Sequence, residues 1–142
     1  MRYSRIDRIV TETMAGRECP LRFTLSGLEE LESRTGLSFL GFVDTIGQGQ
    51  PSLSHLTDAV WIALKGCDGK IRRDDAAALV MDYLRERGIP GLVQLVMAVM
   101  GASGIMGPEI SANMLKDAGM DAEEEGKNGE AARETKRRAL KA

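Results

Sequence analysis

The sequence predicts a mostly helical α+β fold, in which an N-terminal β-hairpin packs on about five helices. Two observations carry this prediction. Leu21, Phe23 and Leu25 alternate with polar residues, which is the period of a strand with one buried face. From residue 26 onward the apolar residues recur at helical spacing, and glycines separate the helical stretches from one another.

The hairpin is expected over about residues 8–25, with Ala15-Gly16-Arg17 as its turn, after a loose segment at residues 1–7. Ser26 and Glu29 have the spacing of a capping box, so the first helix should cover about residues 27–35 and end at Gly36. The same patterns predict further helices over about 38–46, 54–65, 74–87, 91–100 and 108–115.

Length and composition favour one globular domain, which we place at residues 1–118 of the 142. Hydrophobic residues make up 43% of the chain and charged residues 28%, as in ordinary soluble proteins. The net charge of −2 and an aromatic content of 4% do not favour nucleic-acid binding. Residues 119–142 hold acids and bases in equal number and almost no large apolar side chain, so we predict a flexible charged tail there.

The longest apolar region resembles a membrane span at first sight, because residues 88–108 include no charged side chain. Its uninterrupted apolar part, Leu92–Met100, is far shorter than the roughly 20 residues that a bilayer requires. We therefore expect no membrane segment. Cys19 and Cys67 lack the spacing of a metal or redox motif and no secretory signal precedes them, so we expect reduced thiols in the cytoplasm.

The loop at residues 65–75 resembles a calcium-binding EF-hand loop. If Gly69 takes the sixth loop position, the first and third fall on Leu64 and Gly66, which have no side-chain oxygen. We therefore expect no calcium binding. We expect instead that Leu53 and Ile71 form a short β-bridge, which would give an EF-hand-like helix pairing without the metal.

Catalytic patterns are missing from the sequence. His55, the single histidine, has no cysteine beside it that could complete a metal site or a nucleophile–base pair. No serine lies in a nucleophile elbow, and the glycines at residues 101–104 are not followed by the lysine of a phosphate loop. We predict a protein without catalytic residues, metal site or cofactor.

Methionines are concentrated in the C-terminal half, and this concentration is typical of adaptable binding surfaces. The helix at residues 91–100 is apolar around nearly its whole circumference, so either the core of the monomer or a partner must cover it. In a domain of this size we expect part of this region to contact a partner protein or a second copy of the chain. The residues assigned to that contact are Leu92, Val96, Met97, Met100, Ile105 and Met106.

Three stretches carry a resemblance to a known family: residues 21–42, residues 53–64 around Trp61, and residues 74–83. Together they resemble the phage tail assembly chaperone-like family, which includes a tail protein of the gene transfer agents, phage-derived particles of alphaproteobacteria. The resemblance covers roughly residues 8–100 and rests on apolar residues and glycines. Residues 1–8 and the chain beyond Met106 depart from the family pattern and inherit nothing from it.

This resemblance implies a role in the tail morphogenesis of a phage or gene transfer agent. Such a chaperone would act in the cytoplasm of the bacterial host, shielding the tape measure protein and recruiting tail tube subunits to it. The alternatives are a structural tail component that stays in the particle and, from a different class, a degenerate EF-hand-like regulatory module.

Overall fold

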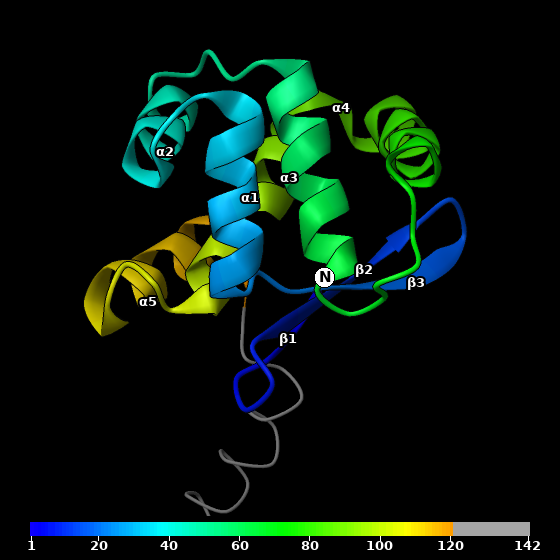
Figure 1. Cartoon of the computed structure of the whole chain (residues 1–142). Helices are drawn as coiled ribbons and strands as arrows, with labels where there is room; N and C mark the ends of the chain where they lie inside the picture. Colours follow the sequence, from blue (N-terminus) through cyan, green and yellow to red (C-terminus); the bar gives the residue numbers. More distant parts are fainter. Residues whose placement is uncertain (121–142) are drawn as a thin grey trace, which may run out of the picture.

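A computed structural model describes residues 1–120 and combines a three-stranded antiparallel sheet with five helices (Figure 1). The expected mostly helical α+β fold is therefore confirmed. Buried residues from Tyr3 to Met120 form one hydrophobic core, so sheet and helices pack as a unit. The charged tail that the sequence predicts lies, from residue 121 onward, outside the described residues.

The sheet is a meander of β1 (Arg2–Ser4), β2 (Ile9–Met14) and β3 (Arg17–Leu21). Ala15 and Gly16 both have positive φ, at 52° and 74°, as the two-residue turn between β2 and β3 requires. The expectation of a loose segment at residues 1–7 was wrong for its first half. Tyr3 pairs with Val10 and is buried with it, so β1 is held by the backbone ladder and by its one large side chain.

Strand β3 ends four residues earlier than the sequence predicts, because Arg22 turns toward the end of a helix. The Arg22 amide donates to the carbonyl of Ala63 at 2.9 Å, and its Nη2 donates to the carbonyl of Gly66 at 2.8 Å. A cation near the last carbonyls of a helix is favourable. Leu25 consequently lies outside the strand and is 70% exposed.

The first two helices are α1 (Leu25–Thr35) and α2 (Phe39–Gly47). The capping box expected at Ser26 was wrong: Thr24 caps α1 by accepting from the amide of Gly27 at 3.0 Å. The predicted stop at Gly36 is confirmed, with φ of 72°. Ser38 caps α2 as expected, accepting from the amide of Gly41 at 3.0 Å.

Helix α3 (Leu53–Lys65) packs against α1 and α4 (Arg73–Ser103), and α5 (Pro108–Asp117) packs on the end of α4. The proposed β-bridge between Leu53 and Ile71 was wrong, because Leu53 is the first residue of α3. The Ile71 carbonyl instead accepts from Trp61 Nε1 at 3.1 Å. The two helices expected at 74–87 and 91–100 are both present within α4, which is interrupted at Gly88, where φ of 72° and ψ of 179° are not helical.

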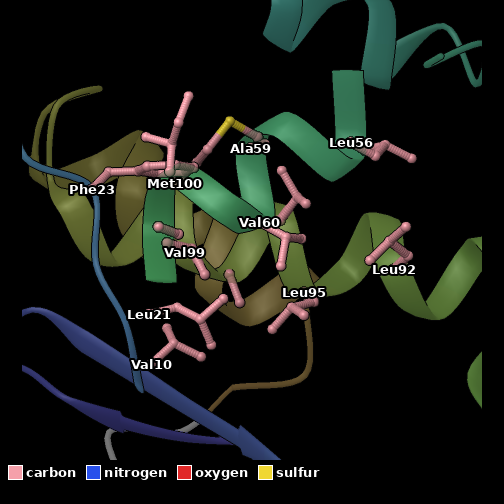
Figure 2. Packing of buried hydrophobic residues seen from close by; sticks show 14 of the residues in the cluster. Val10, Leu21, Phe23, Leu56, Ala59, Val60, Leu92, Leu95, Val99 and Met100 are labelled. Carbon is pink, nitrogen blue, oxygen red and sulfur yellow. The ribbon is translucent and has the colours of Figure 1, made fainter. Parts of the chain in front are cut away.

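The core lies between the sheet and the helices and centres on the C-terminal half of α4. Figure 2 shows Val10 and Leu21 of the sheet below Leu95 and Val99 of α4, with Val60 of α3 on the other side. All five side chains are fully or almost fully buried. Over its whole length, α4 contacts α3, α5 and β2.

One carboxylate lies within this apolar layer. Glu12 of β2 is buried on the same sheet face as Val10 and Met14, where it accepts from the hydroxyl of Tyr83 on α4 at 2.7 Å. Its other oxygen accepts from the amide of Thr13 at 2.8 Å. A buried charge needs such partners. The contact ties the sheet to the N-terminal half of α4.

Substitution of Gly66 tests the contact between β3 and α3. A Cβ at Gly66 would overlap the carbonyl oxygen of Arg22, whereas a Cβ at Gly69, in the same loop, would meet nothing within 4 Å. Overpacking of this kind costs about 1–3 kcal/mol. We expect Gly66→Ala to lower the free energy of unfolding in urea by that amount and Gly69→Ala to leave it nearly unchanged. Equal stabilities of the two variants would contradict the close approach.

Tyr83→Phe tests the tie to Glu12. Burial, and then the hydrogen bond to Glu12, raise the pKa of the Tyr83 phenol above its ordinary value of 10.0. The folded state therefore keeps a proton that the unfolded chain loses, so this contribution is complete below pH 10 and decreases as the pH rises further. We expect Tyr83→Phe to be less stable than the wild type by about 1–3 kcal/mol at pH 8.

Above pH 10 the difference between the two proteins should shrink by up to about 1.4 kcal/mol per pH unit. Urea denaturation at a series of alkaline pH values measures it. A difference that stays constant to pH 11 would show that the phenol is not held protonated by the fold.

Candidate functional site

The six residues that the sequence assigns to a partner contact are divided between the core and the surface. Leu92, Val96 and Met100 are buried among the helices and the sheet. Met97 and Met106 are half-buried and pack against the core from its edge, and Ile105 is exposed. In this conformation the outward-facing part of the assigned region is therefore the corner between α4 and α5. Contact with a partner stays a prediction.

Small residues near the end of α4 allow α5 to pack closely against it. A Cβ at Gly101 would lie 3.0 Å from the carbonyl oxygen of Ser111 and 3.1 Å from the Cβ of Met114. Ala98 and Ala102, on either side of Gly101, are fully buried. Because α5 packs closely on the last turn of α4, the apolar side chains of that turn are covered within the fold and need no partner protein to bury them.

The α4–α5 corner is built by two glycines with left-handed backbone. Gly104 has φ of 75° and Gly107 has φ of 86°, and the Gly107 amide donates to the Gly104 carbonyl at 3.0 Å. Side chains other than glycine rarely adopt this conformation. Between the two glycines stand Ile105 and Met106, so the corner presents these two apolar side chains at a tight turn.

The turn between β1 and β2 reaches this corner from the other end of the chain. Arg8, which has a positive φ of 58°, places its guanidinium against Gly104, and its Nη1 donates to the carbonyl of Ala102 at 3.5 Å. Residues 94 positions apart thus meet at one place. The sequence analysis placed Arg8 at the start of the predicted hairpin and did not assign it to a site, because no local pattern pairs an arginine with a distant glycine.

A cavity of about 560 Å³ lies where this turn, the end of α4, and α5 meet. Arg5 and Arg8 of the β1–β2 turn line it together with Gly101 of α4, Ser111 and Leu115 of α5, and Met120. Its volume falls in the range of ligand pockets, roughly 300–1,000 Å³. Three exposed isoleucines each adjoin a lining residue along the chain: Ile6 (78% exposed), Ile105 (45%) and Ile110 (51%).

A second group of polar residues, centred on Asp58 of α3, has a structural role. Asp58 is buried and accepts from Arg34 Nε at 3.1 Å and from Arg73 Nε at 2.7 Å. These bonds join α1, α3 and the start of α4. Beside them the Trp61 ring lies under Lys65, whose Nζ is 3.8 Å from the ring centroid, and the indole N–H is already bonded to Ile71. This group has its partners within the fold.

The residues with potential reactivity do not come together. Within residues 1–120, no three histidine, cysteine, aspartate or glutamate side chains are grouped as metal ligands would be. Burial raises the pKa of the Cys19 thiol, and partial desolvation raises that of Cys67, whose residue is exposed, so neither has the lowered pKa of a reactive thiol. His55 is half-buried in the first turn of α3. The expected lack of calcium binding stays a prediction.

Two carboxylates at the loop between α3 and α4 accept hydrogen bonds from backbone amides of the same segment. Asp68 accepts from the amide of Lys70 at 3.1 Å, and Asp75 accepts from the amide of Arg72 at 3.1 Å. The second bond fixes the start of α4. No helix in the described part of the chain has the length and apolar character needed to cross a bilayer.

Comparison with known proteins places this geometry in a phage context. A family model described as "Phage tail tube protein, GTA-gp10" matches residues 9–103, which run from the start of β2 to the end of α4. The match includes the core helices and ends just before Gly104, so α5 and β1 lie outside it. The searches of curated proteins and of solved structures gave no match.

Paired substitutions distinguish the buried from the exposed part of the assigned region. Met100→Asp would place a carboxylate without partners in the core, which should cost at least about 3 kcal/mol. Ile105→Asp changes an exposed corner residue and should cost less than about 1 kcal/mol. We expect circular dichroism melts to show a large loss of stability for Met100→Asp alone. A folded Met100→Asp variant would mean that this helix face is accessible.

Proposed function

We propose that this chain, which belongs to the phage tail family described as "Phage tail tube protein, GTA-gp10", is a non-catalytic tail assembly chaperone. It shields the tape measure protein and recruits tail tube subunits to it, in the cytoplasm of the host cell, before the particle is complete. The family match over residues 9–103 carries the tail role. The arrangement of the α4–α5 corner supports the chaperone role within it.

A chaperone for a long apolar partner needs a surface that adapts and releases. Met97 and Met106 are half-buried at the edge of the core, and Met106 follows the exposed Ile105 in the chain. Methionine side chains are flexible and polarisable, so they accommodate different partner side chains at small cost. The exposed isoleucines are few, which favours transient contacts over a permanent interface.

The sheet edges also favour a transient role over a place in the tube wall. A subunit that joined its neighbours through sheet edges would need long edge strands with free amides. Edge strand β1 has three residues, and β3 carries Pro20, which has no amide hydrogen to donate. Within the described residues the sheet is thus poorly suited to extension across subunits.

A structural tail tube component is the second candidate, because the description of the family itself names the tail tube. The two candidates differ in where the protein is at the end of assembly. A chaperone leaves the particle, whereas a tube component stays in it at a fixed number of copies. Both require the protein for tail formation.

Deletion of the gene in a producing strain, followed by electron microscopy and quantitative mass spectrometry of purified particles, tests the proposal. We expect tailless or aberrant particles from the deletion strain and less than about one copy of the protein per wild-type particle. Complementation with the wild type should restore tails, and Ile105→Asp should restore them poorly although it folds. Many copies per mature particle would establish the tube component instead. Normal tails without the gene would refute both roles.

A further inference from the structure

A buried hydroxyl in the wall of the cavity beside the α4–α5 corner lacks a hydrogen-bond partner. Ser111 of α5 lines this cavity and is only 5% exposed, and its Oγ forms no hydrogen bond with any described residue. Buried hydroxyls in folded proteins are nearly always bonded, because an unbonded one costs free energy. A serine hydroxyl turns by rotation about a single bond, so an oxygen atom held in the cavity can supply the missing partner.

Arg8 is a cation in the same wall, and its position is well fixed. It has a positive φ of 58°, its guanidinium lies against Gly104, and its Nη1 donates to the Ala102 carbonyl at 3.5 Å. A guanidinium has several N–H groups, so others remain available to donate. None of the ion pairs formed between described residues includes Arg8. A guanidinium held in this way loses little further entropy when it binds a carboxylate.

Arg5 is not counted as a binding group of this cavity. It lines the cavity as well, but it already has an interaction partner. Asp7 and Glu109 adjoin lining residues in the chain without lining the cavity themselves, and Asp7 accepts from the Ser4 hydroxyl at 3.3 Å. None of the described residues that line the cavity is acidic. We therefore assign the recognition of an anion to Arg8.

Arg8 and Ser111 approach the last turn of α4 from different elements. The Arg8 guanidinium lies against Gly104, and the Ser111 carbonyl oxygen lies 3.0 Å from the position of a Cβ at Gly101. The spacing of these two glycines corresponds to about one turn of a helix. A carboxylate has two oxygens that accept hydrogen bonds, so one such group can accept from both residues.

The rest of the wall is mainly apolar. Leu115 is half-buried and Met120 is buried, and both line the cavity together with Pro108 and Ala112. The volume of about 560 Å³ exceeds what a carboxylate alone would fill. Contact with these side chains would remove apolar surface of a bound molecule from water. The cavity therefore suits a molecule with an apolar part next to its carboxylate.

We propose that this cavity binds a carboxylate that is joined to a short apolar group. The carboxylate accepts from the Arg8 guanidinium and from the Ser111 hydroxyl, and the apolar group packs against Leu115 and Met120. Two sources have this chemistry: a free organic acid, and the carboxyl-terminal residue of another chain when its side chain is apolar. Such a site goes beyond the proposed tail role, which does not require a bound molecule in this cavity.

Three small molecules test this chemistry in the isotope-labelled full chain at neutral pH, where a carboxylic acid is ionised. Hexanoate has both parts of the proposed pair, hexanamide lacks the charge, and acetate lacks most of the apolar part. We expect saturable amide shifts with hexanoate at residue 8 and at residues 101–115. The other two molecules should bind at least about tenfold more weakly, because each lacks one half of the recognised pair.

Two short peptides then distinguish the sources. Each has an acetylated amino end and a carboxyl-terminal leucine, whose carboxyl group is free in one peptide and amidated in the other. If the free-carboxyl peptide binds at least as tightly as hexanoate, the source is the terminus of another chain. If it binds more weakly, the source is a free organic acid. The amidated peptide is the control for contacts that need no carboxylate.

Substitutions in the wall supply the second arm. Ser111→Ala removes an unsatisfied hydroxyl, so we expect it to keep or raise the stability in urea while it weakens hexanoate binding at least about fivefold. Arg8→Gln should weaken hexanoate binding at least about tenfold. Arg85→Gln, on the exposed N-terminal half of α4, is the matched control and should leave the affinity unchanged. Arg8 also supports the corner, so circular dichroism checks the fold, and Ser111→Ala decides alone if Arg8→Gln is unfolded.

Three results would overturn the proposal. Equal affinities of hexanoate and hexanamide would show that the carboxylate is not recognised. An unchanged hexanoate affinity in Ser111→Ala would show that the hydroxyl takes no part. The absence of a saturable shift at residues 101–115 with every acid would show that the cavity does not bind this class of molecule. Because no tail protein or particle is used, these failures are separate from a failure of the tail role.

Discussion

The fold depends on enclosing the C-terminal half of α4. Ala98, Val99 and Met100 are consecutive, so they project on different sides of this helix, and all are buried. A helix that is apolar on all sides is stable in water only when other elements surround it. Strand β2 covers one side, α3 a second, and α5 the end of the helix.

Polar contacts then fix the directions of the elements around that core. Glu12 and Tyr83 join β2 to the half of α4 that precedes the kink, while Asp58 joins α3 to α1 and to the start of α4. Arg22 attaches the end of β3 to the last carbonyls of α3. Each contact bridges segments that are distant in sequence, and each has a buried partner whose loss would leave a polar group unsatisfied. Apolar packing determines which residues are buried, and these polar contacts determine how the elements are oriented around the core.

Three glycines shape the corner between α4 and α5. Gly101 permits the close approach of α5, and Gly104 and Gly107 form the corner, where Ile105 is exposed and Met106 is half-buried against the core. The family match ends at residue 103, so the corner and α5 lie outside the shared part of the fold. In the proposed function, the shared core provides a rigid support and the corner provides the contact with the tail partner.

The sequence by itself determined the class of the fold, the stop of α1 at Gly36, the cap of α2 at Ser38 and the membership in a phage tail family. These depend on local periodicity and on glycine conformation, which a few consecutive residues define. It also identified the region around α4 as the one that must be covered. The end of β3 and the cap of α1 that the sequence predicts were wrong by a few residues. The contact of Arg22 with α3, which ends the strand, has no local signature in the sequence.

Only the tertiary structure decided which side of that region faces water. Leu92, Met100 and Ile105 are all large apolar residues, so hydrophobicity alone does not distinguish them. The first two are nevertheless buried and the third is exposed. Leu92 and Met100 lie within α4, which elements distant in the sequence cover, whereas Ile105 lies beyond its last turn, between Gly104 and Gly107. Periodicity reports how a helix is patterned, but the burial of each side chain depends on which distant elements pack against it.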